Sequence, residues 1–289
     1  MRVAVIGLGT MGFPMARHLV TAGHDVVARD LDPARLRELG VQQAASLDDI
    51  DVVLLSLPSP ADVENVVLGR DGIRDGARPG SLLVDMSTSP PALARRLAAE
   101  CPELDVLDAP VSGGPRGAID ATLTIMVGGD PGTFERARPL FESLGRLVVL
   151  VGGHGAGQTA KLCNNLIAGS TMAAVAEACA IAEAEGIDPA TLYELLTAST
   201  GDSRVLRTRF PLGGVDDAHP SSRDWATLFA LDLIAKDVGL ALELADEHGI
   251  DARVATAALA AYAAAQREGL GALDYSAVYL RGAGGERAD

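Results

Sequence analysis

The sequence contains few aromatic residues, few cysteines and almost no lysine. Aromatic side chains make up 3% of the 289 residues, so the core must be built mainly from Ala, Val and Leu. The three cysteines, at positions 101, 163 and 179, form no CxxC pair, and the five histidines lack metal-ligand spacing. These absences argue against a metal site or a disulfide framework and favour reduced thiols in a cytoplasm.

The sequence also has no excess of basic residues and no signal-peptide pattern. With 24 basic and 39 acidic residues, the net charge of −15 argues against binding to nucleic acid or to an anionic membrane. The N-terminus lacks the long apolar core and cleavage site of a signal peptide. The least polar long stretch, residues 162–182, carries Asn164, Asn165 and Glu177, so we interpret it as a buried helix. We therefore expect a cytoplasmic protein.

The first half of the chain alternates short apolar runs with helical segments such as Pro33–Leu39 and Pro91–Glu100. This alternation predicts an α/β domain over residues 1–157, a Rossmann-type doubly wound parallel sheet with helices on both faces. The expected strands are Val3–Ile6, Asp25–Ala28, Asp51–Leu57, Ser81–Asp85, Asp105–Asp108, Leu123–Val127 and Leu147–Val151.

The second half has almost no β-like runs and predicts an all-α domain over residues 158–289, for substrate binding and dimerisation. A long helix, Gln158–Glu185, joins the two domains and ends at Gly186, and Asp188 caps the helix that follows. Residues 200–223 show little periodicity and predict a loop, and residues 281–289 predict a frayed tail. Further helices are expected at Leu228–His248 and Arg253–Glu268.

Residues 7–12 form a G-x-G-x-x-G loop directly after the first strand and before a helix. Gly7 permits the tight turn, Gly9 lets the backbone approach a pyrophosphate, and Gly12 lets the helix pack on the strand. The helix N-terminus offers unpaired N–H groups to the phosphates. We favour a dinucleotide site over a turn without a ligand. The expected contacts are Gly7, Leu8, Gly9, Thr10, Met11 and Gly12.

Asp30 follows the second strand and bears on the choice of cofactor. A carboxylate there can accept hydrogen bonds from the ribose hydroxyls and would repel a 2′-phosphate. Leu31 cannot pair with a phosphate, and strand alternation should point Arg29 to the other face. The sequence therefore favours NAD over NADP, unless Asp30 merely caps the helix that begins near Pro33.

Five ordered motifs resemble those of the β-hydroxyacid dehydrogenase family, which includes 3-hydroxyisobutyrate dehydrogenase and 2-hydroxy-3-oxopropionate reductase. The resemblance covers nearly the whole chain. It implies further cofactor contacts from Leu57, Pro58, Asp62, Thr88 and Lys236. One departure is Ala121, where the family usually has glycine, and this change should only stiffen a turn. The motifs begin with Gly7–Ala16, continue with Leu57–Pro58 together with Asp85–Pro90, and end with Asp108–Gly114, Gly155–Asn165 and Lys236–Asp237.

Two segments are candidates for binding the substrate carboxylate. Successive glycines in Ser112-Gly113-Gly114 let backbone N–H groups converge as an anion-binding nest, and the Ser112 hydroxyl adds a donor. The alternative for this segment is a flexible turn. Lys236, flanked by apolar residues, is expected near the carboxylate or the nicotinamide, and its alternative is a surface charge pair with Asp237.

Lys161 and Asn165 are the candidate catalytic residues. Their i, i+4 spacing places both on one face of the long helix. Protonated Lys161 can donate to a substrate oxygen as hydride reaches carbon, and its neutral form can take the proton in oxidation. Asn165 can hold the same oxygen. A surface lysine on a polar stripe is the alternative, but the flanking residues are apolar and the chain has only one other lysine.

Together these features predict an NAD-dependent oxidoreductase that acts on a short β-hydroxyacid or semialdehyde. Two alternatives remain on the same scaffold: an imine or keto-acid reductase and a catalytically silent dinucleotide-binding protein. A decarboxylating enzyme of the 6-phosphogluconate type would need a longer C-terminal part. The Ala-rich helices of the second half predict a homodimer or homotetramer. Residues 204–223 match no substrate signature, so the acid itself is not named by the sequence.

Overall fold

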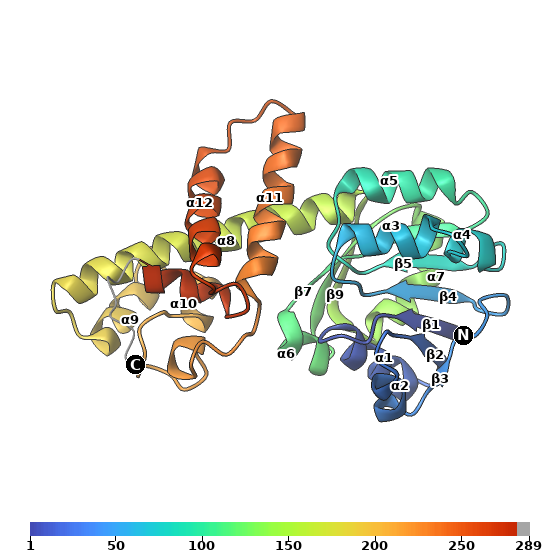
Figure 1. Ribbon diagram of the computed structural model, residues 1–289, viewed down its shortest axis with the longest axis horizontal. Coiled ribbons are helices and arrows are strands. Elements are labelled where there is room, and N and C mark those ends of the chain that lie inside the picture. The colour runs from blue at the N-terminus through green and yellow to red at the C-terminus, as the bar shows by residue number, and fades with distance from the viewer. Residues whose placement is uncertain (282–289) are drawn as a thin grey trace. The chain divides into compact units, whose positions relative to one another are not determined.

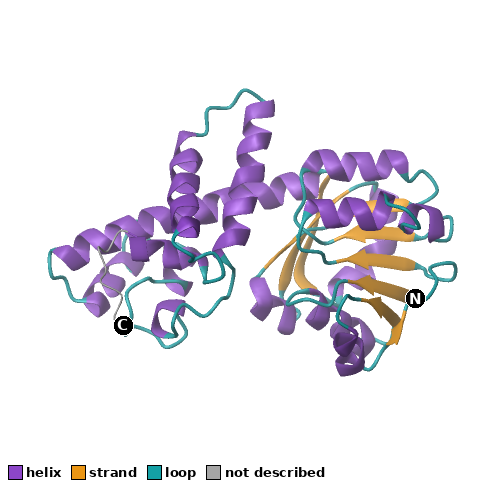
Figure 2. Ribbon diagram, viewed as in Figure 1, coloured by secondary structure: helices purple, strands orange, loops and turns teal. Residues whose placement is uncertain are grey.

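The computed structural model describes residues 1–281, and the predicted tail beyond Arg281 lies outside the described residues. The chain divides into two compact units, Met1–Lys161 and a second that begins at Leu162. Strands make up a sheet in the first unit, whereas the second unit is built from helices (Figures 1 and 2). The α/β fold class with a helical C-terminal part is confirmed.

The sheet of the first unit has nine strands, and the described order runs β3-β2-β1-β4-β5-β6-β8-β7, with β9 paired to β8. Strands β1 to β6 pair in parallel, as predicted for this part of the chain, although β3 was not among the expected strands. Strand β8 runs antiparallel to β6 and β7, which the sequence pattern did not indicate. The strands are β1 (Arg2–Ile6), β2 (Asp25–Arg29), β3 (Gln42–Gln43), β4 (Val52–Leu55), β5 (Leu82–Asp85), β6 (Asp105–Asp108), β7 (Val111–Ser112), β8 (Leu123–Gly128) and β9 (Gly145–Gly152).

Helices cover both faces of this sheet, because alternate strand residues point to opposite sides. In β1, Val3 and Val5 belong to one core and Ala4 and Ile6 to the other. The first core includes residues of α1 (Gly12–Thr21), α2 (Pro33–Leu39), α6 (Gly114–Ile119) and α7 (Pro131–Glu142). The second includes residues of α3 (Pro60–Leu68), α4 (Ile73–Gly76) and α5 (Pro91–Glu100).

The second unit packs its helices around one core that contains Met172, Phe210 and Tyr262. Residue Gly186 adopts φ +74° after the long helix, and Asp188 caps the next helix by accepting from Thr191 N, both as predicted. A short helix, α10, interrupts the predicted loop 200–223. The elements are α8 (Ala156–Ala184), α9 (Pro189–Thr197), α10 (Arg204–Thr208), η1 (Pro220–Ser222), α11 (Leu231–Glu247), α12 (Arg253–Arg267) and η2 (Tyr275–Arg281).

Helix α8 is the one helix among residues 1–281 that is long and apolar enough to cross a membrane. Length and composition alone are weak grounds for a span, since a core helix of a soluble protein passes the same test. One face of α8 packs in the second unit's core through Met172, Ala176 and Cys179. Its N-terminal part buries the polar side chains of Lys161 and Asn165. These features agree with the interpretation of this stretch as a buried helix.

Candidate active site

The glycine loop lies between β1 and α1 and has two sterically required glycines. Gly7 adopts φ +93°, and a Cβ there would lie 2.3 Å from the Ser56 carbonyl oxygen. A Cβ on Gly12 would lie 1.9 Å from the carbonyl oxygen of Gly7. Gly9 is different, because a Cβ there would meet no described atom within 4 Å. The open space at Gly9 fits the close approach of a pyrophosphate, so the loop fits a dinucleotide.

The start of α1 is also suited to an anion. Its N-cap residue, Met11, makes no side-chain capping hydrogen bond, and the first turn has no acidic residue. The positive end of the helix dipole therefore remains available to a phosphate. Thr10 is exposed beside it, whereas the Leu8 side chain is fully buried, so Leu8 could meet a cofactor only through its backbone.

Asp30 connects the end of β2 to the glycine loop. Its Oδ2 accepts from Leu8 N at 2.6 Å and its Oδ1 from Asp32 N at 2.8 Å. The N-cap of α2 is Asp32, which accepts from Ala34 N at 2.9 Å, so the interpretation of Asp30 as a mere helix cap is wrong. The Arg29 guanidinium donates to the Ala44 carbonyl at 2.7 Å.

The loops after β4 and β5 adjoin the glycine loop, because β1, β4 and β5 are parallel neighbours. Leu57 N donates to Ser87 Oγ at 2.9 Å, which connects the Leu57–Pro58 segment to the segment that carries Thr88. Asp62 lies in the first turn of α3, where its carboxylate accepts from Ser59 Oγ at 2.5 Å. Helix capping accounts for this contact of Asp62, and a cofactor role for it stays a prediction.

The Ser112-Gly113-Gly114 segment connects β7 to α6. Gly113 has φ +137° and Gly114 φ +61°, conformations that favour glycine. Gly113 is exposed, and Ser112 and Gly114 are half-buried. Beyond the same helix, Ala121 has φ +50°, so the expectation that it only stiffens a turn is wrong. Its Cβ is held in the left-handed region, which is strained for alanine.

Buried polar groups anchor the start of α8, and sequence reasoning did not single them out. Asp108 accepts from Gly155 N at 2.7 Å and from Gln158 N at 2.9 Å. The Gln158 side chain accepts from Ser89 N at 3.0 Å and donates to the Ser87 carbonyl at 2.9 Å. These partners are 47 to 71 residues apart, so only the fold brings them together. They fix the first turn of the helix that carries Lys161.

Two carboxyl groups near this anchor have perturbed acidity. Burial raises the pKa of Asp85 to about 6, although Ser87 and Ser89 donate hydrogen bonds to it. Burial also raises the pKa of Asp108, against the effect of its two backbone donors. Both groups therefore hold their protons more tightly in the folded protein than in the unfolded chain.

Lys161 and Asn165 are both buried, with 8% and 4% of their surfaces exposed. The interpretation of Lys161 as a surface lysine on a polar stripe is therefore wrong. The Asn165 Nδ2 donates to Asp237 Oδ2 at 2.6 Å, and Lys236 Nζ lies 3.1 Å from Asp237 Oδ1. The predicted residues Asn165 and Lys236 thus meet at one buried carboxylate, Asp237.

The arginines of residues 204–223 are partly committed to the protein's own structure. Arg207 pairs with Asp202 at 2.7 Å, and Arg209 with the fully buried Asp274 at 3.2 Å. The Arg209 guanidinium also stacks over the Tyr275 ring. These two side chains therefore stabilise the second unit through contacts within it.

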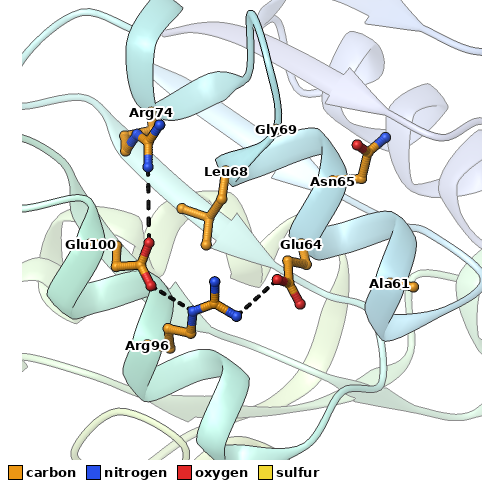
Figure 3. Close-up of a pocket in the computed structure, with 8 residues that line it drawn as sticks. All are labelled: Ala61, Glu64, Asn65, Leu68, Gly69, Arg74, Arg96 and Glu100. Atoms are coloured by element: carbon orange, nitrogen blue, oxygen red, sulfur yellow. Dashed lines mark hydrogen bonds and ion pairs between the residues drawn. The ribbon is translucent and has the colours of Figure 1, made fainter.

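A surface hollow between α3, α4 and α5 is a separate feature of the first unit (Figure 3). Arg96 pairs there with Glu64 at 2.8 Å and with Glu100 at 2.5 Å, and Arg74 lies 3.9 Å from Glu100. The charges lining this hollow satisfy one another. No predicted site residue lines it, so it is not the candidate active site.

Comparisons with known proteins match both parts of the chain. Residues 2–153 match the NAD binding domain of 6-phosphogluconate dehydrogenase, and residues 155–281 match the NAD-binding domain of NADP-dependent 3-hydroxyisobutyrate dehydrogenase. The chain is 40% identical to the NAD-dependent L-serine dehydrogenase of Pseudomonas aeruginosa, with 96% of each chain covered. It is 41% identical to the 3-hydroxyisobutyrate dehydrogenase of the same organism, again with 96% of each covered.

A solved structure agrees with these relatives. The Mycobacterium tuberculosis 3-hydroxyisobutyrate dehydrogenase determined with L-serine is 35% identical and has a TM-score of 0.89, with 97% of this chain and 98% of that chain covered. Such similarity over nearly the full length goes beyond a shared dinucleotide-binding fold. The chain belongs to the β-hydroxyacid dehydrogenase family of NAD(P)-dependent oxidoreductases.

Proposed function

We propose that this protein transfers hydride between NAD and a short β-hydroxyacid, with Lys161 as general acid and base. The observation that carries the proposal is the burial of Lys161 one helical turn before the buried Asn165 on α8. Lysine is among the residue types least often buried in folded proteins. An imine reductase or a silent dinucleotide-binding protein gives no reason for this pair.

The residues act on the substrate oxygen. In reduction, the Lys161 ammonium donates a proton to the carbonyl oxygen as that oxygen gains negative charge, and in oxidation neutral Lys161 removes the hydroxyl proton. Asn165 hydrogen-bonds to the same oxygen without titrating. The nicotinamide, when bound, supplies or accepts the hydride. General acid–base assistance of this kind accelerates a reaction by roughly 10²–10⁴-fold.

Other residues bind and orient the reactants. We assign the substrate carboxylate to the Ser112-Gly113-Gly114 segment, whose two glycines have positive φ, and to Lys236. Residues 1–157 form the proposed cofactor domain and residues 158–289 the substrate and dimerisation domain. The proposed cofactor contacts are Gly7, Leu8, Gly9, Thr10, Met11, Gly12, Asp30, Leu57, Pro58, Asp62, Thr88 and Lys236.

The preferred cofactor is NAD. The Asp30 carboxylate at the end of β2 would repel a 2′-phosphate, and Leu31 beside it is fully exposed but cannot bind one. The Arg29 guanidinium already donates to the Ala44 carbonyl. Because this guanidinium, at the end of β2, is directed toward the Ala44 carbonyl, it is less suited to bind a 2′-phosphate.

A substrate panel tests the proposal. L-Serine, 3-hydroxyisobutyrate, glycerate and 2-hydroxyacids of the same length are tested with NAD, and the corresponding semialdehydes and a cyclic imine with NADH, at the nicotinamide absorbance. Turnover of β-hydroxyacids but not of 2-hydroxyacids of the same length supports the proposal. Turnover of only an imine supports the alternative reductase, and NADH binding without turnover on any member supports the silent protein.

The assembly is proposed to be a cytoplasmic homodimer or homotetramer formed through the helical part. Helix α8 exposes Ile167 and Ile181 at 66% and 67%, and α12 exposes Val254 at 73%. Large exposed apolar side chains on helices favour burial against another chain. Small-molecule substrate and cofactor are the other expected partners.

A further inference from the structure

We infer that Asp237 is a positioning residue that sets the orientation of the Asn165 amide, so that Asn165 presents a hydrogen-bond donor to the substrate oxygen. The inference rests on the proposed place of Asn165 at the substrate. It adds a role for a residue that contacts two predicted site residues but carries none of the proposed chemistry itself.

The hydrogen bond between α8 and α11 fixes which end of the amide faces Asp237. Asn165 and Asp237 are 72 residues apart, and the Asn165 Nδ2 to Asp237 Oδ2 distance is 2.6 Å. Both residues are buried, at 4% and 1% exposure. Only the NH₂ end of an amide can donate a hydrogen bond, and here it donates to a carboxylate oxygen. The orientation therefore follows from chemistry as well as from geometry.

The carbonyl oxygen and the second N–H hydrogen of the Asn165 amide can be assigned partners as well. Asn164 Nδ2 donates to Asn165 Oδ1 at 2.9 Å, which occupies the carbonyl end. An amide NH₂ has two hydrogens, and Asp237 takes one of them. We assign the second hydrogen to the substrate oxygen. A neutral donor suits a substrate oxygen that gains negative charge as hydride arrives at carbon.

Asp237 also acts on Lys236 through charge. Its Oδ1 lies 3.1 Å from Lys236 Nζ, and the Lys236 side chain is 27% exposed while that of Asp237 is 2% exposed. A buried carboxylate is stable only with a compensating charge and hydrogen bonds. One carboxylate thus holds the partly exposed lysine and the buried amide in fixed relation to each other.

Side-chain amide NMR tests the orientation without turnover. The chain has only three asparagines, Asn65, Asn164 and Asn165, so ¹⁵N-asparagine labelling gives three side-chain NH₂ pairs. We expect one Asn165 proton to resonate downfield because it binds a carboxylate, and Asn165→Asp assigns the pair by removing it. Asp237→Asn, which adds a fourth asparagine NH₂ pair, should move this proton upfield. An unchanged shift in Asp237→Asn would overturn the orientation.

Kinetic measurements on single and double variants of Asn165 and Asp237 distinguish a positioning role of Asp237 from a purely structural one. We expect Asp237→Asn to lower kcat roughly 10- to 100-fold, the usual cost of misplacing a reacting group. Asn165→Asp places two carboxylates together and should raise the pKa of one, which changes the pH profile. The double variant Asn165→Asp with Asp237→Asn restores a hydrogen bond with donor and acceptor reversed. It should recover Tm but not kcat, because residue 165 can then no longer donate.

A matched control lies on the same helix. Asp232 of α11 accepts from the Gln266 amide of α12 at 2.7 Å, but it is exposed. Asp232→Asn should leave kcat unchanged. Recovery of both Tm and kcat by the double variant, or wild-type kcat in Asp237→Asn, would overturn the positioning role alone. No turnover by the wild type on the whole panel would overturn the proposed function and with it the substrate role of Asn165.

Discussion

The carboxylate of Asp30 accepts a hydrogen bond from Leu8 N at 2.6 Å, across 22 residues of chain. The same group therefore orders the glycine loop and presents negative charge at the end of β2. Its second oxygen accepts from Asp32 N. A single side chain thus connects the glycine loop to the carboxylate on which the proposed preference for NAD rests.

Replacing Asp30 by Asn should relax the preference for NAD. The neutral amide no longer repels a 2′-phosphate, so the ratio of kcat/KM with NAD to that with NADP should fall. The wild type should favour NAD at equal concentration. Asp32→Asn is the matched control, because Asn also caps a helix well and residue 32 lies two positions away. A larger kcat/KM with NADP in the wild type would show that the argument from Asp30 is wrong.

Replacing Ala121 by Gly should stabilise the protein. Ala121 has φ +50°, and a left-handed conformation costs a non-glycine residue about 1–2 kcal/mol. The greater freedom of glycine in the unfolded chain offsets part of this gain, by about 0.4–1 kcal/mol. Urea unfolding should therefore show a modest increase in stability, whereas the exposed helical control Ala260→Gly in the interior of α12 should lose about 1 kcal/mol. A lower unfolding free energy for Ala121→Gly than for the wild type would contradict the inferred backbone strain at Ala121.

The buried Asp85 predicts an unusual pH dependence of stability. Its folded pKa of about 6 exceeds the unfolded value of 3.8. Its contribution is therefore fully present below about pH 4 and is lost as the pH rises through 6. The loss amounts to about 3 kcal/mol above that range.

The variant Asp85→Asn removes this titration. The difference in unfolding free energy between variant and wild type, measured by urea unfolding from pH 4.5 to 7.5, should shift in favour of the variant as the pH rises. Asp130→Asn provides the contrast, because the Thr133 backbone hydrogen bond lowers the pKa of Asp130, so its titration lies below this range and the difference should stay constant from pH 4.5 to 7.5. A constant difference for Asp85→Asn would show that Asp85 does not titrate in this window.

Local sequence signals predicted the elements whose causes are local. The apolar run Val3–Ile6 and the Asp188 cap appear nearly as expected. Helix α7 was missed, although Asp130-Pro131 marks its start, because Pro139 and several charges interrupt its apolar pattern. Strand β8 was expected, but its antiparallel direction was missed because strand direction depends on the connections, not on side-chain alternation.

In the candidate site, too, short-range patterns could be predicted from the sequence and long-range contacts could not. The G-x-G-x-x-G loop and the i, i+4 pair of Lys161 and Asn165 are short-range patterns and could be found in the sequence. The contacts of Asp237 with Asn165 and of Gln158 with Ser87 join residues 72 and 71 positions apart. No spacing rule connects such partners, so their pairing depends on the tertiary structure.

Replacing Ile181 by Glu should weaken the proposed oligomer. Ile167 and Ile181 are both exposed and lie on one face of α8, where a charge would be costly to bury in an interface. Light scattering at micromolar concentration should show a dimer or tetramer for the wild type and a smaller species for Ile181→Glu. Ile250→Glu, at an exposed isoleucine outside the helices, is the control. A monomeric wild type would contradict the proposed assembly.

Replacing Lys161 by Ala should remove most of kcat, by roughly 10²–10⁴-fold, while NADH still binds through the glycine loop. Lys161→Arg should rescue little, because a guanidinium does not give up its proton near neutral pH and is larger than an ammonium. Lys236→Ala should act mainly on substrate or cofactor binding. NADH fluorescence titration and steady-state kinetics separate these effects.

Chemical labelling checks the same assignment independently. The chain has only two lysines, so an amine-selective reagent can modify Lys161, Lys236 and the N-terminus alone. Lys161 is 8% exposed, and NADH with a carboxylate inhibitor should protect it and Lys236 further. Free labelling of Lys161 in that complex, or near-normal turnover of Lys161→Ala on the true substrate, would overturn the proton-transfer role. The family and the fold rest on other residues and would stand.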